Sequence, residues 1–276
     1  MLNGSTRLIA HVGYPTTTFK SPMIYNPWFE AHAINAAVVP LGVTGENFAA
    51  TFPQICRFTN FAGALVTMPH KVAVLDLLDE VSQTVEICGS ANAVRLDERG
   101  RLIGDMFDGE GFVRGARRNG AAIQGKRALV IGSGGVGSAI AASLAAAGLA
   151  ELALFDLNTT SAEALAARLT KHRPDLKLIV GERDPAGFDL VVNATPLGMN
   201  DGDPLPLDAS RLAPTTFVGE VVLKKETTPF LAAAKARGCR TQIGLDMLFE
   251  QIPAYLEFFG FPAATADELR NLARID

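Results

Sequence analysis

The stretch ALVIGSGGVGSAIAASLAAAG, residues 128 to 148, decides the fold of this protein. Four apolar residues predict a buried strand, a glycine-rich turn follows, and an alanine-rich run predicts a helix. Gly132, Gly134 and Gly137 have the G-x-G-x-x-G spacing in the strand-turn-helix context that a dinucleotide-binding fingerprint requires. The alternative is a plain glycine turn in a parallel sheet.

Each glycine of this turn has a distinct expected role. Gly132 permits the tight turn, Gly134 lets the backbone approach a pyrophosphate, and Gly137 allows close packing of helix on strand. Gly135 and Val136 open the helix, where free N–H groups and the positive end of the helix dipole favour phosphate. We therefore assign these five residues to a cofactor site.

Asp156 follows the next apolar run, about 24 residues after Gly132. A carboxylate at this place accepts hydrogen bonds from both adenosine ribose hydroxyls and repels a 2′-phosphate. Leu157 and Asn158 come next, with no arginine to neutralise that phosphate. This favours NAD over NADP. The alternative is that Asp156 is only a helix cap or turn residue.

Composition excludes several classes of protein. The 276 residues are 48% hydrophobic and 20% charged, which suits one large or two modest soluble domains. A net charge of −4, a pI near 5.6 and scattered lysines and arginines argue against nucleic-acid binding. There is no signal-peptide core and no apolar run of 18 residues, so we expect no membrane span and a cytoplasmic location.

Cys56, Cys88 and Cys239 lie far apart and form no CxxC pair. We expect reduced thiols rather than a disulfide framework or a zinc site. No other feature of the sequence requires a metal.

Strand and helix patterns alternate along the chain, which predicts an α/β protein whose first part has a parallel sheet. In that part we expect a helix with Ser21 as N-cap and Pro22 as its first residue, and another helix that begins near Pro69. Residues 91–108 predict a hairpin with Gly100 in its turn. The other expected strands are 7–13, 36–43, 61–68, 149–158, 188–196 and 215–222, and the other expected helices are 46–58, 109–120, 160–172, 245–260 and 265–276.

Lys71 and Thr67 follow a buried strand in GALVTMPHK. Carboxyl ends of strands in open α/β sheets are where ligands bind. The positive dipole end of a helix that starts near Pro69 would disfavour the ammonium form of Lys71, which suits proton transfer. The alternative is a solvated lysine beside a strand.

Four further polar residues stand at junctions between predicted elements. Asp108 lies between the hairpin and a helix, Asn92 lies in a small-residue turn, and Asn193 and Thr195 follow a strand of the cofactor half. Each could instead serve only as a cap or in turn chemistry.

Six segments in order resemble motifs of the shikimate/quinate dehydrogenase family. They are KSP, VTMPHK, GSANAV, FDGEG, VVNATPLGM and GLDMLFEQ, and they extend over nearly the whole chain around the glycine fingerprint. The resemblance implies two domains with a cleft between them. Residues 1–107, completed by 247–276, form an α/β substrate domain, and residues 108–246 form a Rossmann-type domain.

The resemblance also implies roles for the residues that match the motifs. Lys71 and Asp108 correspond to the catalytic pair. Ring hydroxyls would contact Asp108 and also Thr67, Asn92 and Gln251, and Ser21 would contact the substrate carboxylate. Val221, Gly244 and the Asn193–Thr195 loop would lie beside the nicotinamide.

The chain departs from the family pattern at several positions. Phe19 replaces the first serine of the substrate motif, and Leu223 aligns with a tyrosine, so two hydroxyls that contact the carboxylate are missing. Met106 and Phe107 replace polar residues. Where NADP-using members have N-R-T, this chain has DLN, which again favours NAD.

The leading hypothesis is an NAD-dependent enzyme of the shikimate pathway of aromatic amino acid biosynthesis, acting on shikimate or quinate. One alternative is the same hydride transfer on an altered substrate, such as an amino analogue, and another is a non-catalytic NAD-binding regulatory protein. The expected partner is a small cyclic hydroxy acid, and monomer and homodimer both stay open.

Overall fold

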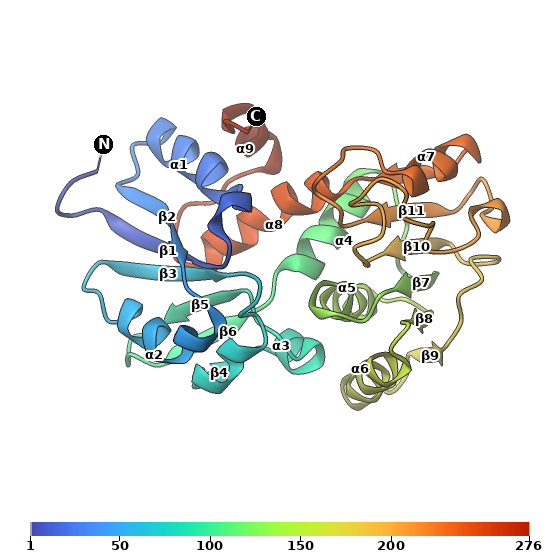
Figure 1. Cartoon of the computed structure of the whole chain (residues 1–276), viewed down its shortest axis with the longest axis horizontal. Helices are drawn as coiled ribbons and strands as arrows, with labels where there is room; N and C mark the ends of the chain where they lie inside the picture. The colour runs from blue at the N-terminus through green and yellow to red at the C-terminus, as the bar shows by residue number, and fades with distance from the viewer. Residues whose placement is uncertain (1, 276) are drawn as a thin grey trace. The chain divides into compact units, whose positions relative to one another are not determined.

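A computed structural model describes residues 2–275 of the chain (Figure 1). The chain divides into two compact units. Unit 1 contains Met1–Phe107 and Ile252–Asp276, and unit 2 contains Asp108–Gln251. The second division falls inside helix α8 (Gly244–Phe258). The α/β fold class predicted from the sequence is confirmed.

Unit 2 contains a parallel sheet of the doubly wound type. Its strand order is β12-β11-β10-β7-β8-β9. The strands are β7 (Arg127–Ile131), β8 (Glu151–Phe155), β9 (Lys177–Val180), β10 (Leu190–Asn193), β11 (Phe217–Glu220) and β12 (Arg240–Gln242). Because the order reverses between β7 and β10, their carboxyl ends define the place where such sheets bind ligands.

Helices cover both faces of this sheet. Helices α5 (Gly135–Ala146) and α6 (Thr159–His172) lie on one face and α7 (Pro229–Ala236) lies on the other (Figure 1). Helix α4 (Asp108–Arg118) packs against α5, so closely that a Cβ on Gly109 would lie 2.0 Å from the Ala139 carbonyl oxygen. Under α7 the buried core includes Leu129, Val191 and Phe230.

Unit 1 contains a mixed sheet with the order β2-β1-β3-β5-β6-β4. Its strands are β1 (Arg7–Gly13), β2 (Ala36–Gly42), β3 (Phe61–Val66), β4 (Glu80–Val81), β5 (Ala93–Leu96) and β6 (Leu102–Asp105). The predicted parallel pairing holds for β1, β2 and β3, but β5 is antiparallel to both β3 and β6. The hairpin predicted over residues 91–108 is confirmed as β5 and β6 with Gly100 in the turn, and it makes the sheet mixed, because so short a turn cannot provide a parallel crossover.

The helices of unit 1 lie on both sides of this sheet. Helices α1 (Ser21–Ala31) and α9 (Ala266–Leu272) pack together on one side and α2 (Gly45–Ile55) lies on the other, with the short α3 (Gln83–Cys88) near β6 (Figure 1). Ser21 is not the N-cap of α1. The backbone is already helical at Lys20 (φ −91°, ψ −22°), so Lys20 takes the cap position and Ser21 is the first helical residue.

The α-helix predicted from Pro69 onward is also wrong. Residues 68–72 form turns, and only a short 3-10 helix, Ala73–Leu77, follows. Tertiary contacts explain the difference, because His70 Nε2 donates to the Val43 carbonyl at 2.7 Å and the His70 ring stacks on Phe48 at 4.0 Å. The carbonyl of Lys71 accepts from the Ala91 amide, which holds this residue against another segment.

Candidate active site

The glycine turn after β7 has a backbone that only glycine fits. Gly132 has φ +102°, and a Cβ there would lie 2.9 Å from the Ala194 carbonyl. A Cβ on Gly137 would lie 2.0 Å from the Gly132 carbonyl oxygen. The turn therefore requires a left-handed conformation at its first residue and close contact between helix and strand at its last.

The next part of the turn is open. Gly134 is the N-cap residue of α5, and a Cβ there would meet nothing within 4 Å. Gly135 and Val136 form the first helical positions, whose N–H groups have no partner within a helix. The Ser133 hydroxyl is buried and has no hydrogen-bond partner in the described part of the chain. These features fit the phosphates of a dinucleotide.

Asp156 lies at the edge of this turn. It follows β8, and its carboxylate accepts from the Ser133 amide at 2.6 Å and from the Asn158 amide at 2.8 Å. The N-cap of α6 is Asn158, so Asp156 is not the helix cap. Asp156 thus bonds to its own turn at Asn158 and also lies next to the glycine turn, and the neighbouring Leu157 is 89% exposed.

The loop after β10 is stabilised by its own polar side chains. Asn193 Oδ1 accepts from the Thr195 hydroxyl at 2.6 Å and from the Thr195 amide, and Asn193 Nδ2 donates to the Leu197 carbonyl. The loop is adjacent to the glycine turn, because Gly132 approaches Ala194. Asn193 and Thr195 thus form the turn hydrogen bonds considered from the sequence, and these bonds fix the backbone beside the glycine turn.

Glu220 ends β11, directly across from Asn193 in the ladder. It is fully buried, Oε2 accepts from the Thr228 hydroxyl at 2.7 Å, and Oε1 has no partner among residues 2–275. Burial raises the pKa of Glu220 to about 7, and the bond from Thr228 and the charge of Lys235 oppose that rise. The sequence analysis did not identify this carboxyl group.

Three predicted site residues, the catalytic Lys71 and the substrate-binding Thr67 and Asn92, lie on neighbouring segments of unit 1. Thr67 follows β3, and its amide donates to the Val12 carbonyl at 2.9 Å. Asn92 joins the same edge, because its carbonyl accepts from the Val66 amide. The Ala91 amide donates to the Lys71 carbonyl at 2.8 Å. Backbone bonds thus connect the segments that carry Thr67, Lys71 and Asn92.

Asn92 also determines the path of the chain into Asp108. The Asn92 side chain is buried, and its Oδ1 accepts from the Phe107 amide at 3.0 Å. Asp108 is the next residue and begins α4, with its side chain buried. Lys71 belongs to unit 1 and Asp108 is the first residue of unit 2. Lys71 lies in a turn and not in the first turn of an α-helix, so a helix dipole does not act on its ammonium group as the sequence suggested.

Phe19 lies at the same edge of the unit 1 sheet as Thr67, and its ring stacks on His11, a residue that the sequence analysis did not identify. The rings of Phe19 and His11 are 3.9 Å apart and nearly parallel, at 20°. A Cβ on Gly13 would touch both Thr67 and Phe19, which places these two side chains next to each other. His11 was missed because one polar residue in the apolar strand RLIAHVG gives no periodic signal.

The remaining predicted residues lie at the ends of helices or strands. Ser21 is half-buried at the start of α1. Gly244 opens α8 so close to β11 that a Cβ would lie 2.3 Å from the Val222 carbonyl oxygen and 2.8 Å from the Val221 carbonyl carbon. Gln251 is 8% exposed, and its Oε1 is buried without a hydrogen-bond partner in the region described.

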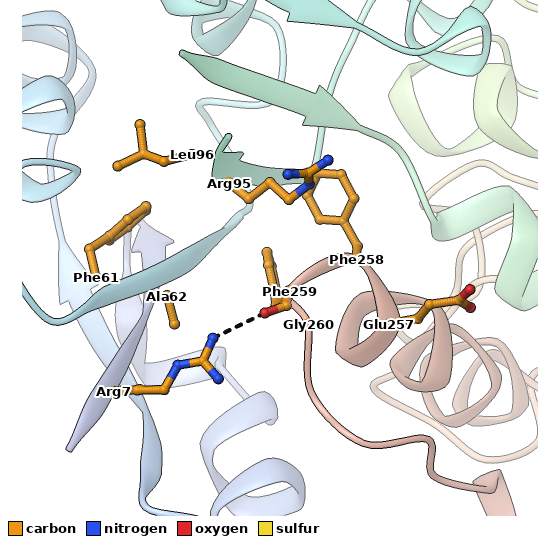
Figure 2. Close-up of a pocket in the computed structure, with 9 residues that line it drawn as sticks. All are labelled: Arg7, Phe61, Ala62, Arg95, Leu96, Glu257, Phe258, Phe259 and Gly260. Atoms are coloured by element: carbon orange, nitrogen blue, oxygen red, sulfur yellow. Dashed lines mark hydrogen bonds between the residues drawn. The ribbon is translucent and has the colours of Figure 1, made fainter. Parts of the chain in front are cut away.

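A cavity of about 460 Å³ lies elsewhere in unit 1 (Figure 2). It is next to the first residues of β1 and β3, at the amino ends of these strands. The Arg7 guanidinium donates to the Phe259 carbonyl at 3.2 Å, and Arg95 stacks over the Phe258 ring (Figure 2). The cavity is thus at the end of the sheet opposite the Thr67 and Lys71 segments.

Residues 2–275 contain no cluster of metal ligands, no disulfide and no membrane-spanning helix. No group of three or more His, Cys, Asp or Glu side chains there could hold a metal ion. The three cysteines are free and buried, and burial raises the pKa of Cys56 to about 12. Within the same residues, no helix is long and apolar enough to cross a membrane.

Comparison with known proteins gives consistent matches. Residues 12–94 match the family model described as the shikimate dehydrogenase substrate binding domain. Shikimate dehydrogenase (NADP(+)) of Acidiphilium cryptum (strain JF-5) is 36% identical over 278 residues, which cover 100% of this chain and 99% of that protein.

Solved structures agree with these sequence matches. Shikimate 5-dehydrogenase from Listeria monocytogenes, in complex with shikimate and NAD, has a TM-score of 0.91 at 26% identity and covers 98% of this chain and 97% of its own. Quinate dehydrogenase from Corynebacterium glutamicum, in complex with NAD, has a TM-score of 0.86 at 29% identity, with coverage of 97% and 98%.

Proposed function

Because the chain belongs to the shikimate dehydrogenase family, we propose that it interconverts a secondary alcohol and a ketone on a cyclic hydroxy acid of the shikimate or quinate type. It is an NAD(P)-dependent oxidoreductase. The observation that carries the proposal is that backbone hydrogen bonds connect the neighbouring segments that carry Thr67, Lys71 and Asn92 at one edge of the unit 1 sheet. This edge lies inside the segment that matches the substrate-binding domain.

Lys71 is proposed to exchange the proton of the reacting hydroxyl. Its side chain is half-buried, and the buried His70 fixes the turn that carries it. An amine held in place within hydrogen-bond reach of a hydroxyl can take and return its proton, which contributes about 10²–10⁴-fold to a rate. The bound nicotinamide supplies the hydride acceptor or donor.

The other polar residues are proposed to orient the ring. Asp108 orients the substrate and accepts a hydrogen bond from a ring hydroxyl, and Asn92 fixes the backbone that leads into Asp108. Thr67 and Gln251 contact further ring hydroxyls. Ser21 contacts the carboxylate.

We propose NAD as the preferred cofactor. Gly132, Gly134 and Gly137 with Asp156 would hold its pyrophosphate and adenosine ribose, and Val221 and Gly244 would lie near its nicotinamide. The Asp156 carboxylate disfavours a 2′-phosphate. The Acidiphilium relative is named for NADP, whereas the Listeria and Corynebacterium structures contain NAD, so the choice rests on Asp156 and Leu157.

We also propose that the two units correspond to the two functional domains. Residues 1–107 with 247–276 would bind the substrate, and residues 108–246 would bind the dinucleotide, whereas unit 2 extends five residues further, to Gln251.

A second candidate is the same chemistry on an altered substrate, such as an amino analogue. Phe19 and Leu223 favour it, because they replace two hydroxyls that contact the carboxylate in the family. A non-catalytic NAD-binding role is less well supported, because Lys71, Asp108 and Asn92 are all retained.

Kinetics of Lys71→Met test the proposal. Wild type should reduce NAD with shikimate or quinate, and the variant should lose about 10³-fold in kcat with little change in KM. Lys171→Met, which alters an exposed lysine on α6, is the matched control and should keep wild-type rates. Near-normal kcat in Lys71→Met would reject the proton-transfer role, and NAD binding without turnover of either acid by wild type would favour the regulatory alternative.

A further inference from the structure

Phe107 is the last residue of unit 1 before the chain enters unit 2 at Asp108. Its side chain is half-buried, and its ring meets two aromatic rings of α8 edge to face. The ring centroids are 5.0 Å from Tyr255 and 5.5 Å from Phe258. Both belong to unit 1, to which the chain returns at Ile252. Phe107 thus connects the segment that leaves unit 1 with the part of α8 that returns to it.

The backbone around Phe107 is held as well. The Asn92 amide donates to the Asp105 carbonyl at 3.0 Å, and Asn92 Oδ1 accepts from the Phe107 amide at 3.0 Å. The side chain of Met106, between these two bonds, is buried. Residue 107 is therefore fixed twice within unit 1, through its amide by Asn92 and through its ring by α8.

This double attachment limits where Asp108 can lie. Adjacent Cα atoms are about 3.8 Å apart, so a fixed residue 107 restricts the position of the next residue. The Ala91 amide also donates to the Lys71 carbonyl at 2.8 Å. Residues 91 and 92 therefore hold the segments that carry both members of the proposed catalytic pair. Residue 107 attaches Asp108 to the unit that contains Lys71, although Asp108 itself is counted in unit 2.

The ring of Phe107 adds a restraint that the backbone bond does not give. A single hydrogen bond from the amide leaves the residue able to rotate about that bond, whereas a ring packed edge-on against two others resists rotation. A reacting group that moves by about 1 Å can lower a rate about 10²-fold. A smaller side chain at position 107 would remove this restraint directly before Asp108.

We infer that Phe107 is a positioning residue for Asp108, its ring packing against Tyr255 and Phe258 so that the start of α4 presents the Asp108 carboxylate to the substrate. This inference rests on the proposed function and deepens it. Phe107 acts through Asp108 and not through a contact of its own with the substrate. The effect of losing the ring therefore depends on the presence of the Asp108 side chain.

A double-mutant cycle of Phe107→Ala and Asp108→Ala tests this dependence. Phe107→Ala should lower kcat/KM for shikimate or quinate about 10²-fold, because the displaced carboxylate no longer orients the substrate. In the Asp108→Ala background the same change should cost less than about threefold, because no carboxylate is left to displace. Effects that multiply in the double variant would overturn the inference. Asp108→Ala alone with wild-type kcat/KM would instead reject the proposed role of Asp108.

Phe107→Leu and Phe261→Ala separate positioning from stability. Leucine keeps an apolar side chain against α8 and should retain about one tenth or more of the wild-type kcat/KM; it takes the place of Phe107→Ala in the cycle if alanine prevents folding. Phe261→Ala removes a ring of unit 1 that packs on Phe29 at 5.1 Å, so it should lower the melting temperature but change kcat/KM less than about twofold. An equal loss of kcat/KM in Phe261→Ala and Phe107→Ala would overturn the inference, because general loosening of unit 1 would explain both.

Hydrogen exchange without substrate gives a second readout. Helix α4 begins at Asp108, and α-helical bonding pairs the Phe112 amide with the Asp108 carbonyl. Exchange of this amide should become at least about tenfold faster in Phe107→Ala and stay near the wild-type rate in Phe261→Ala. If wild type turns over neither acid, the proposed function fails, and this exchange rate alone then decides whether Phe107 holds the start of α4. An unchanged rate in Phe107→Ala would overturn the inference.

Discussion

Glu220 offers a stability prediction that depends on a single buried carboxyl group. It is fully buried at the end of β11, with Thr228 as its hydrogen-bond donor and with Oε1 unpartnered in the described chain. The change we consider is Glu220→Gln, which keeps the size of the side chain and an oxygen that can accept from Thr228. The variant carries no charge at any pH.

The magnitude follows from the pKa of Glu220, which burial raises from 4.5 to about 7. A raised pKa means that the folded state holds a proton that the unfolded state releases. Wild type therefore has its full stability below pH 4.5 and loses stability as the pH rises through about 7. At about 1.4 kcal/mol per pH unit, this loss reaches about 3 kcal/mol relative to Glu220→Gln.

Urea unfolding at pH 5 and pH 8 measures the effect. The free energy of unfolding of wild type, minus that of Glu220→Gln, should fall by about 2.5 kcal/mol between these two values, because a part of the loss has already occurred at pH 5. Any constant cost of the new amide group is the same at both pH values and cancels from this change. Glu163→Gln, an exposed carboxylate on α6 of the same unit, is the control and should give a flat difference.

The result that would refute this reasoning is a difference between wild type and Glu220→Gln that stays constant from pH 5 to pH 8. It would mean that the carboxyl group ionises in the folded state as easily as in the unfolded chain. A difference that grows with pH would refute it as well, because the sign would be reversed.

The cofactor turn gives two further predictions. Gly137→Ala should lower the free energy of unfolding by about 3 kcal/mol or more, because its Cβ would lie 2.0 Å from the Gly132 carbonyl oxygen. Gly134→Ala should unfold at the wild-type temperature, because its Cβ would meet nothing within 4 Å, but calorimetry should show weaker NAD binding. Equal destabilisation by both would contradict the geometry of the turn. Asp156→Asn should shift the ratio of NAD to NADP affinity toward NADP by at least about tenfold, and Leu157→Arg in that background should extend the shift by adding a partner for the 2′-phosphate. An unchanged affinity ratio would mean that Asp156 does not contact the adenosine ribose.

Local sequence determined the cofactor half of the fold. The spacing of Gly132, Gly134 and Gly137 expresses short-range steric needs, namely a positive φ and close approach of neighbouring residues, so it can be read without the rest of the chain. The short β9 and α7 escaped prediction, because four and eight residues carry too little periodicity.

Tertiary contacts overruled local preference in unit 1. The stretch after Pro69 has a helical pattern, but the anchoring of His70 on Val43 and Phe48 and the bond from Ala91 to Lys71 hold it in turns. This outcome is not encoded in a window of a few residues, whereas the hairpin from β5 to β6 was predicted from its two strands and Gly100.

The sequence by itself determined the α/β class, the glycine turn and, through ordered motifs, the family and its expected site residues. Only the tertiary structure decided that Phe19 stacks on His11, that Asn92 bonds to the residue before Asp108, and that Glu220 is buried with one oxygen unpaired. The physical reason is that hydrogen bonding and desolvation depend on neighbours from distant segments. A residue's type and spacing show what it can do, whereas its burial and partners decide what it does.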